Sequence, residues 1–177
     1  MKGRPDIAVV VLSPRWKAAL PGHTRLVRRA AEAALASRAR LGACELAVAL
    51  ADDARLRALN RDFRGRDKTT NVLSFTGMRS ADEPGRRRQK PHLGDVVLAL
   101  GQVTREARRQ KKTVGDHVSH LVVHGVLHLL GHDHETEEEA EAMEALETRI
   151  LSGLGIADPY RVHSRPAARE GRPGARP

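Results

Sequence analysis

Hydrophobic and polar positions follow two different periods along this chain. Short apolar runs that alternate with polar residues or are rich in β-branched residues predict four strands, at residues 7–12, 45–50, 71–75 and 95–100. Apolar residues at helical spacing predict helices after residue 14 and at residues 24–42, 52–60, 102–112, 113–130 and 136–150. The last third of the chain is therefore expected to be helical.

The two helices nearest the C-terminus carry clear start and stop signals. Thr113 is followed three residues later by Asp116, and Thr136 by Glu139, which is the spacing of a capping box. Gly131 follows the first of these helices, and glycine readily adopts the left-handed conformation that ends a helix. These signals predict that the chain turns sharply between the two helices.

The length and composition indicate one folded domain. A chain of 177 residues is long enough for one core of ordinary size, and 40% hydrophobic with 30% charged residues indicates neither a disordered nor a membrane-embedded chain. Beyond residue 158, Arg, Pro, Gly and Ala dominate with little periodicity. We therefore expect a single domain over residues 1–158 and a basic, flexible tail over residues 159–177.

Rare residue types exclude several classes of protein. The four aromatic residues are Trp16, Phe63, Phe75 and Tyr160, too few for a protein that stacks single-stranded bases on aromatic platforms. Cys44 is the single cysteine, which excludes an internal disulfide and a multi-cysteine metal site. No apolar run approaches the roughly 18 residues of a membrane span or resembles a signal peptide. We expect a cytoplasmic protein without a membrane partner.

Charge is distributed unevenly along the chain. The net charge of +9 favours a polyanionic partner such as nucleic acid, although an arginine-rich composition alone could produce it. Residues 133–149 contain eight acids and one base, which leaves +16 for the rest of the chain. Because the helix dipole favours acids in the first turns of a helix, we interpret this acidic run as a solvated face. Met143, Leu146 and Ile150 predict the buried stripe of the same helix. The basic excess lies at residues 79–90 and 105–112 and in the tail.

The most specific chemical feature is a histidine cluster within the segment HLVVHGVLHLLGHDH. His124 and His128 are one helical turn apart, so their imidazoles project from the same face of the helix. The turn at Gly131 can then bring His134 toward the same point. Three neutral imidazoles leave one position of a tetrahedral ion open, which is typical of a catalytic metal site.

Each of three other polar residues near the cluster is compatible with two roles. His120 lies one turn before His124 and could orient that ligand from outside the metal shell, or it could simply be a histidine of the helix surface. His132 and Asp133 lie in the turn, where either could hydrogen-bond a ligand or merely solvate a helix end.

The histidine spacing resembles that of the zincin proteases, whose pattern is H-E-x-x-H-x-x-G-x-x-H. The protease glutamate, which activates water, is replaced here by Gly125. This difference argues against proteolysis.

A second resemblance is closer. HGVLHLLGHDH, residues 124–134, resembles the signature H-G-x-L-H-L-x-G-[YH]-D-H of the YbeY family of single-strand-specific endoribonucleases. LNRDFRGRDKTTNVLSF at residues 59–75 and LGDVVLA at residues 93–99 are similar to two further blocks of that family, in the same order. The resemblance covers residues 6–155. It implies an α+β fold with a small mixed four-stranded sheet, about five or six helices, and a metal site at the end of the histidine-bearing helix.

The resemblance also implies residue roles. The family's metal ligands correspond to His124, His128 and His134, and its functional arginine corresponds to Arg64. An arginine beside a metal can bind a phosphate through two hydrogen bonds and stabilise developing charge. One zinc ion suits three imidazoles best, although another divalent transition metal could bind the same ligands.

The function implied is metal-dependent hydrolysis of single-stranded RNA. The family setting is maturation of the 3′ end of 16S ribosomal RNA, ribosome biogenesis and ribosome quality control, with ribosomal RNA and the ribosome as partners and no DNA. Two alternatives remain: a metal-dependent hydrolase of another substrate class, and a non-catalytic ribosome assembly factor.

Overall fold

The computed structural model describes residues 4–39, 41–77 and 90–161. Four strands and six helices occur in these ranges, in the order β1 (Asp6–Val11), α1 (Arg15–Ala19), α2 (His23–Ala36), β2 (Glu45–Ala51), α3 (Asp53–Arg64), β3 (Val72–Thr76), β4 (His92–Ala99), α4 (Leu100–Arg109), α5 (Val114–Leu129) and α6 (Glu137–Gly153). The predicted α+β class is confirmed. Most of the basic segment at residues 79–90 and the tail from residue 162 lie outside the described residues.

The strands form one mixed sheet in the order β1-β2-β4-β3. β1, β2 and β4 are parallel, with α1 and α2 connecting the first pair, whereas β3 runs antiparallel to β4. Parallel neighbours need a long crossover, which the helices between β1 and β2 supply. The mixed four-stranded sheet predicted from the family resemblance is therefore present.

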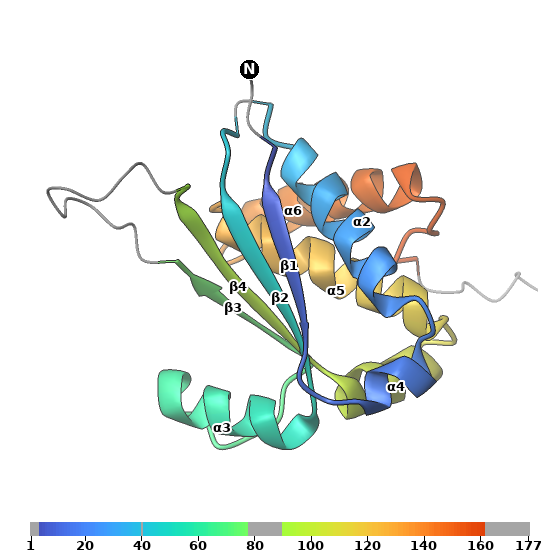
Figure 1. Cartoon of the computed structure of the whole chain (residues 1–177). Coiled ribbons are helices and arrows are strands. Elements are labelled where there is room, and N and C mark those ends of the chain that lie inside the picture. Colours follow the sequence, from blue (N-terminus) through green and yellow to red (C-terminus); the bar gives the residue numbers. More distant parts are fainter. Residues whose placement is uncertain (1–3, 40, 78–89, 162–177) are drawn as a thin grey trace, which may run out of the picture.

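Helices cover the two faces of the sheet unequally. The main core joins the sheet to α2, α5 and α6, which lie on the same side of it (Figure 1). A smaller cluster on the other face joins Leu56 of α3 to Leu73 and Val97 of the sheet. No helix among the described residues is long and apolar enough to cross a membrane.

The C-terminal ends of α2 and α3 differ most from the prediction. α2 ends at Ala36 rather than near residue 42, and the backbone N–H groups of Ser37 and Arg38 donate to carbonyls three residues back. The Arg38 side chain donates to the distant Leu130 carbonyl at 3.1 Å. α3 continues past residue 60 to Arg64 and ends at Gly65, whose φ of 65° is left-handed. The longer α3 places Arg64 in its last turn.

Gly125 lets the central helix α5 lie close to the sheet. A Cβ atom at this position would lie 2.7 Å from Val96 Cγ1 and 3.0 Å from Ser74 Oγ, closer than side chains normally approach. The position that holds glutamate in zincin proteases therefore faces the sheet here, without room for a carboxylate.

Replacing Gly125 by alanine is expected to lower the free energy of unfolding by roughly 1–3 kcal/mol, because the methyl group overpacks the contact between α5 and β4. Denaturant titration followed by circular dichroism measures the change. The control is Gly153→Ala at the end of α6, where an added Cβ meets nothing within 4 Å. Equal stabilities for the two variants would contradict this account of the packing.

Candidate metal centre

Local signals on α5 position its two ligand candidates. The Thr113 hydroxyl accepts the backbone N–H of Asp116 at 3.0 Å, which caps the first turn of α5. The helix ends at Leu129, and Gly131 follows with a left-handed φ of 93°. The backbone N–H of His132 returns to the Leu127 carbonyl at 3.0 Å, so the chain reverses direction as expected.

The reversal brings His134 to His124 and His128. Their nearest ring nitrogens all lie within 4.8 Å of one another, and the Nε2 atoms of His124 and His128 are 3.1 Å apart. Two nitrogens bound to one tetrahedral zinc at 2.0–2.1 Å lie about 3.3 Å apart. The donor set therefore fits a single zinc ion or a similar transition metal.

Burial favours the neutral imidazole that a metal requires. His124 and His128 are half-buried, whereas His134 is exposed. Burial first, then the neighbouring His124 and His134, lowers the pKa of His128 below its ordinary value. A ligand histidine must be unprotonated at the nitrogen that binds, so the lowered pKa favours metal binding near neutral pH.

Arg64 lines the same cavity as the three histidines. The cavity has a volume of about 480 Å³ and includes Ser74 of β3 and Asp133 of the turn. Arg64 Nη2 donates to the Ser74 carbonyl at 3.4 Å, and the residue as a whole is exposed. The predicted arginine and the predicted ligands are therefore brought together, although they are 60 residues apart in the sequence at their nearest.

Polar contacts tie the loop that follows Arg64 to helix α3. Arg57 binds both carboxylate oxygens of Asp67, at 2.8 and 2.9 Å. These hydrogen bonds lower the pKa of the Asp67 carboxyl. Asn60 Nδ2 donates to the Lys68 carbonyl at 2.8 Å, which ties the loop back to the helix.

The two turn residues differ in their relation to the cavity. His132 is exposed and is not among the residues that line it. Asp133 lines it, and its Oδ1 atom accepts the backbone N–H of His134 at 2.8 Å. A larger hollow of about 730 Å³, between α1 and α4, is lined by arginine and small or apolar side chains and contains no histidine.

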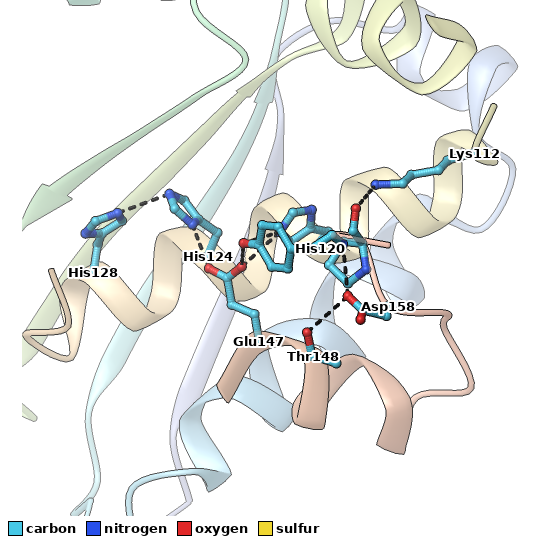
Figure 2. Close-up of polar contacts among 9 residues, drawn as sticks. Lys112, His120, His124, His128, Glu147, Thr148 and Asp158 are labelled. Carbon is cyan, nitrogen blue, oxygen red and sulfur yellow. Dashed lines mark hydrogen bonds and ion pairs between the residues drawn. The ribbon is translucent and has the colours of Figure 1, made fainter. Parts of the chain in front are cut away.

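A buried carboxylate on α6 contacts the histidine stripe. Glu147 is 0% exposed, and its Oε1 atom accepts from His124 Nδ1 at 2.7 Å. Its Oε2 atom accepts from His120 Nε2 at 2.9 Å and from the Tyr160 hydroxyl. Figure 2 shows this carboxylate between His120 and His124.

Hydrogen bonding keeps Glu147 charged in spite of its burial. Burial by itself raises the pKa of a carboxyl group, but the hydrogen bonds from His120, His124 and Tyr160 outweigh it and lower the pKa of Glu147 to about 2. Burial and the adjacent carboxylate raise the pKa of Tyr160. The network is therefore a charged acceptor surrounded by donors.

Sequence reasoning missed Glu147. The acidic pattern predicts that Glu147 is part of a solvated face, and this prediction is wrong for Glu147. It is correct for the exposed acids at the start of α6. A signal was present: Glu147 is four residues after Met143 and four before Leu151, both buried, so it lies within the apolar stripe. His120 and His124 both hydrogen-bond this carboxylate, and their rings lie edge to face with centroids 6.4 Å apart.

Comparisons with known proteins show the family of this chain. The model of the family described as "Endoribonuclease YbeY" matches residues 16–155, which is most of the chain. The chain belongs to the YbeY family. The matched region contains Arg64, the three histidines and Glu147, whereas Tyr160 lies just beyond it.

Individual YbeY relatives agree over most of their length. A protein named "Endoribonuclease YbeY" from Alkalilimnicola ehrlichii is 56% identical over 147 residues, 83% of this chain and 86% of the relative. One of the same name from Paramagnetospirillum magneticum is 51% identical over 156 residues, 88% and 95% of the two chains. A solution structure from Thermotoga maritima is similar with a TM-score of 0.48 and 20% identity, covering 88% of this chain and 99% of the other.

Proposed function

We propose that this protein is a metal-dependent endoribonuclease that hydrolyses phosphodiester bonds in single-stranded RNA. The observation that carries the proposal is the shared cavity, in which an arginine faces three convergent histidines. The names of the YbeY relatives support RNA as the substrate class and endonucleolytic cleavage as the reaction.

The three histidines would hold the metal, which we propose to be one zinc ion, with another divalent transition metal as a substitute. When bound, such an ion lowers the pKa of water and polarises a phosphate oxygen. His124, His128 and His134 supply neutral nitrogen donors, so the ion keeps its full positive charge for the phosphate.

Arg64 would bind the scissile phosphate. Its planar guanidinium offers five donors in a fixed fork, of which the long contact with Ser74 uses one. Two parallel hydrogen bonds to phosphate oxygens would orient the substrate and stabilise the charge that develops in the transition state.

A neighbouring basic cavity supports a path for the RNA strand. This cavity of about 620 Å³ shares Asn71 with the histidine cavity and is lined by Arg109, Lys111 and Lys112. Cations beside a cleavage site raise the local concentration of a polyanion without reading its sequence. These basic residues, at the end of α4 and just after it, would thus guide phosphates toward Arg64.

The resemblance to the YbeY family supports a proposal for the biological setting. We propose action in the maturation of the 3′ end of 16S ribosomal RNA, ribosome biogenesis and ribosome quality control, in the cytoplasm and with the ribosome as partner. We keep the proposal of a single domain over residues 1–158 followed by a basic tail.

The deciding experiment incubates the purified protein with a defined single-stranded RNA and its duplex, with and without chelator. We expect cleavage of the single strand, little cleavage of the duplex, and loss of cleavage with chelator that added zinc reverses. RNA binding without turnover would favour an assembly factor. Hydrolysis of another substrate that single-stranded RNA does not inhibit would favour the alternative hydrolase.

A further inference from the structure

The carboxylate of Glu147 lies beside the histidines, and the proposed function gives it no role. It comes from α6, whereas the histidines that it contacts belong to α5. A fully buried charge is costly unless it is paired and hydrogen-bonded, and Glu147 satisfies this condition with three donors. Two of the three donors are imidazoles of the α5 stripe.

The contact with His124 determines which ring nitrogen is free. A carboxylate accepts hydrogen bonds, so the bond of 2.7 Å to His124 Nδ1 places a proton on that nitrogen. The Nε2 atom of the neutral ring then carries a lone pair. This atom faces His128 Nε2 at 3.1 Å, at the point where the ligand candidates converge.

The other two donors hold the carboxylate itself in place. His120 and the Tyr160 hydroxyl both donate to Oε2, which leaves Oε1 for His124. Tyr160 belongs to the segment that follows α6, and its ring stands edge-on to that of His120 with centroids 5.4 Å apart. Two donors other than His124 therefore hold the carboxylate in position.

We propose that Glu147 is a positioning residue, which sets the tautomer and ring orientation of His124 so that Nε2 is presented to the metal. His120 and Tyr160 hold the carboxylate in the position from which it accepts the His124 hydrogen bond. The inference rests on the proposed metal site. Carboxylates that accept from a metal-ligating histidine in this way fix its orientation and raise its basicity.

The test measures zinc affinity rather than RNA cleavage. In Glu147→Gln the side chain keeps its volume but loses its charge, and we expect zinc to bind about 10- to 100-fold more weakly in competition with a chelating dye. Glu141→Gln, the same change at an exposed position of α6, is the matched control and should bind zinc like the unaltered protein. Circular dichroism checks that both variants are folded.

A second measurement reports the tautomer directly. Two-bond proton–nitrogen NMR spectra of the metal-free, unaltered protein should find His124 protonated at Nδ1, and Glu147→Gln should populate both tautomers. Tyr160→Phe, which removes one donor to the carboxylate, should weaken zinc binding by a smaller factor than Glu147→Gln. The measurement on the unaltered protein decides the point even where Glu147→Gln fails to fold.

The outcomes separate the two proposals. Absence of zinc binding by the unaltered protein would overturn the metal site, and with it the role of Glu147. Tight zinc binding by the unaltered protein, with equal affinity in a folded Glu147→Gln variant, would overturn only the positioning role. A His124 ring protonated at Nε2 in the unaltered protein would overturn it as well.

Discussion

Replacing His128 by alanine is expected to abolish metal binding and to reduce RNA cleavage to the uncatalysed background. His128 is the central member of the cluster, since its ring lies 4.5 Å from that of His124 and 4.9 Å from that of His134, measured between centroids. His124 and His134, whose ring centroids are 5.8 Å apart, would remain as two widely spaced ligands. Metal content by elemental analysis and cleavage of a labelled single-stranded RNA measure the two effects.

The control for this prediction is His132→Ala. His132 is exposed, lies in the adjacent turn and does not line the cavity, so its loss should leave metal content and cleavage unchanged. Undiminished cleavage by a metal-free His128→Ala protein would contradict the proposed mechanism. Thermal unfolding of the metal-free forms separates loss of the ligand from loss of the fold.

Replacing Arg64 by alanine is expected to slow cleavage by about 10²- to 10³-fold, the usual effect of removing one donor that stabilises transition-state charge. Metal content should stay unchanged, because Arg64 lies on α3 and contacts Ser74 rather than the histidines. The rate of a single turnover at saturating RNA measures the effect on the chemical step.

Two further variants define the role of this arginine. Arg64→Lys should recover part of the rate, because a lysine keeps the charge but cannot form two parallel hydrogen bonds to phosphate. Arg55→Ala, an exposed arginine on the same helix, controls for the loss of positive charge and should cleave at nearly the normal rate. Loss of metal from Arg64→Ala, or a normal cleavage rate, would contradict the role in phosphate binding.

The histidine cluster shows how far local sequence signals reach. The caps of α5 and α6, the left-handed Gly131 and the one-turn spacing of His124 and His128 all depend on contacts within a few residues. Such contacts are encoded in short segments and can be predicted from them. The turn at Gly131 was therefore predictable, and so was the approach of His134.

Helix ends were predicted less well than the helices themselves. α2 ends before its predicted end near residue 42, next to Arg38, whose side chain donates to the carbonyl of Leu130, 92 residues away. α3 runs on to Arg64, four residues past Asn60, and the one apolar residue of this extension, Phe63, is exposed. Apolar periodicity reports which positions are buried, and it is silent where a helix extends into solvent.

By itself, the sequence determined the histidine-bearing helix, the spacing of its histidines and membership of the YbeY family, because these rest on local geometry and on matching motifs. Only the tertiary structure decided that Arg64 of α3 enters the histidine cavity and that Glu147 of α6 turns inward to His124. Each contact joins different helices, with 60 residues between Arg64 and His124 and 23 between His124 and Glu147. Their geometry follows from how α3 and α5 pack on the sheet and how α6 packs on α5, which no short segment encodes.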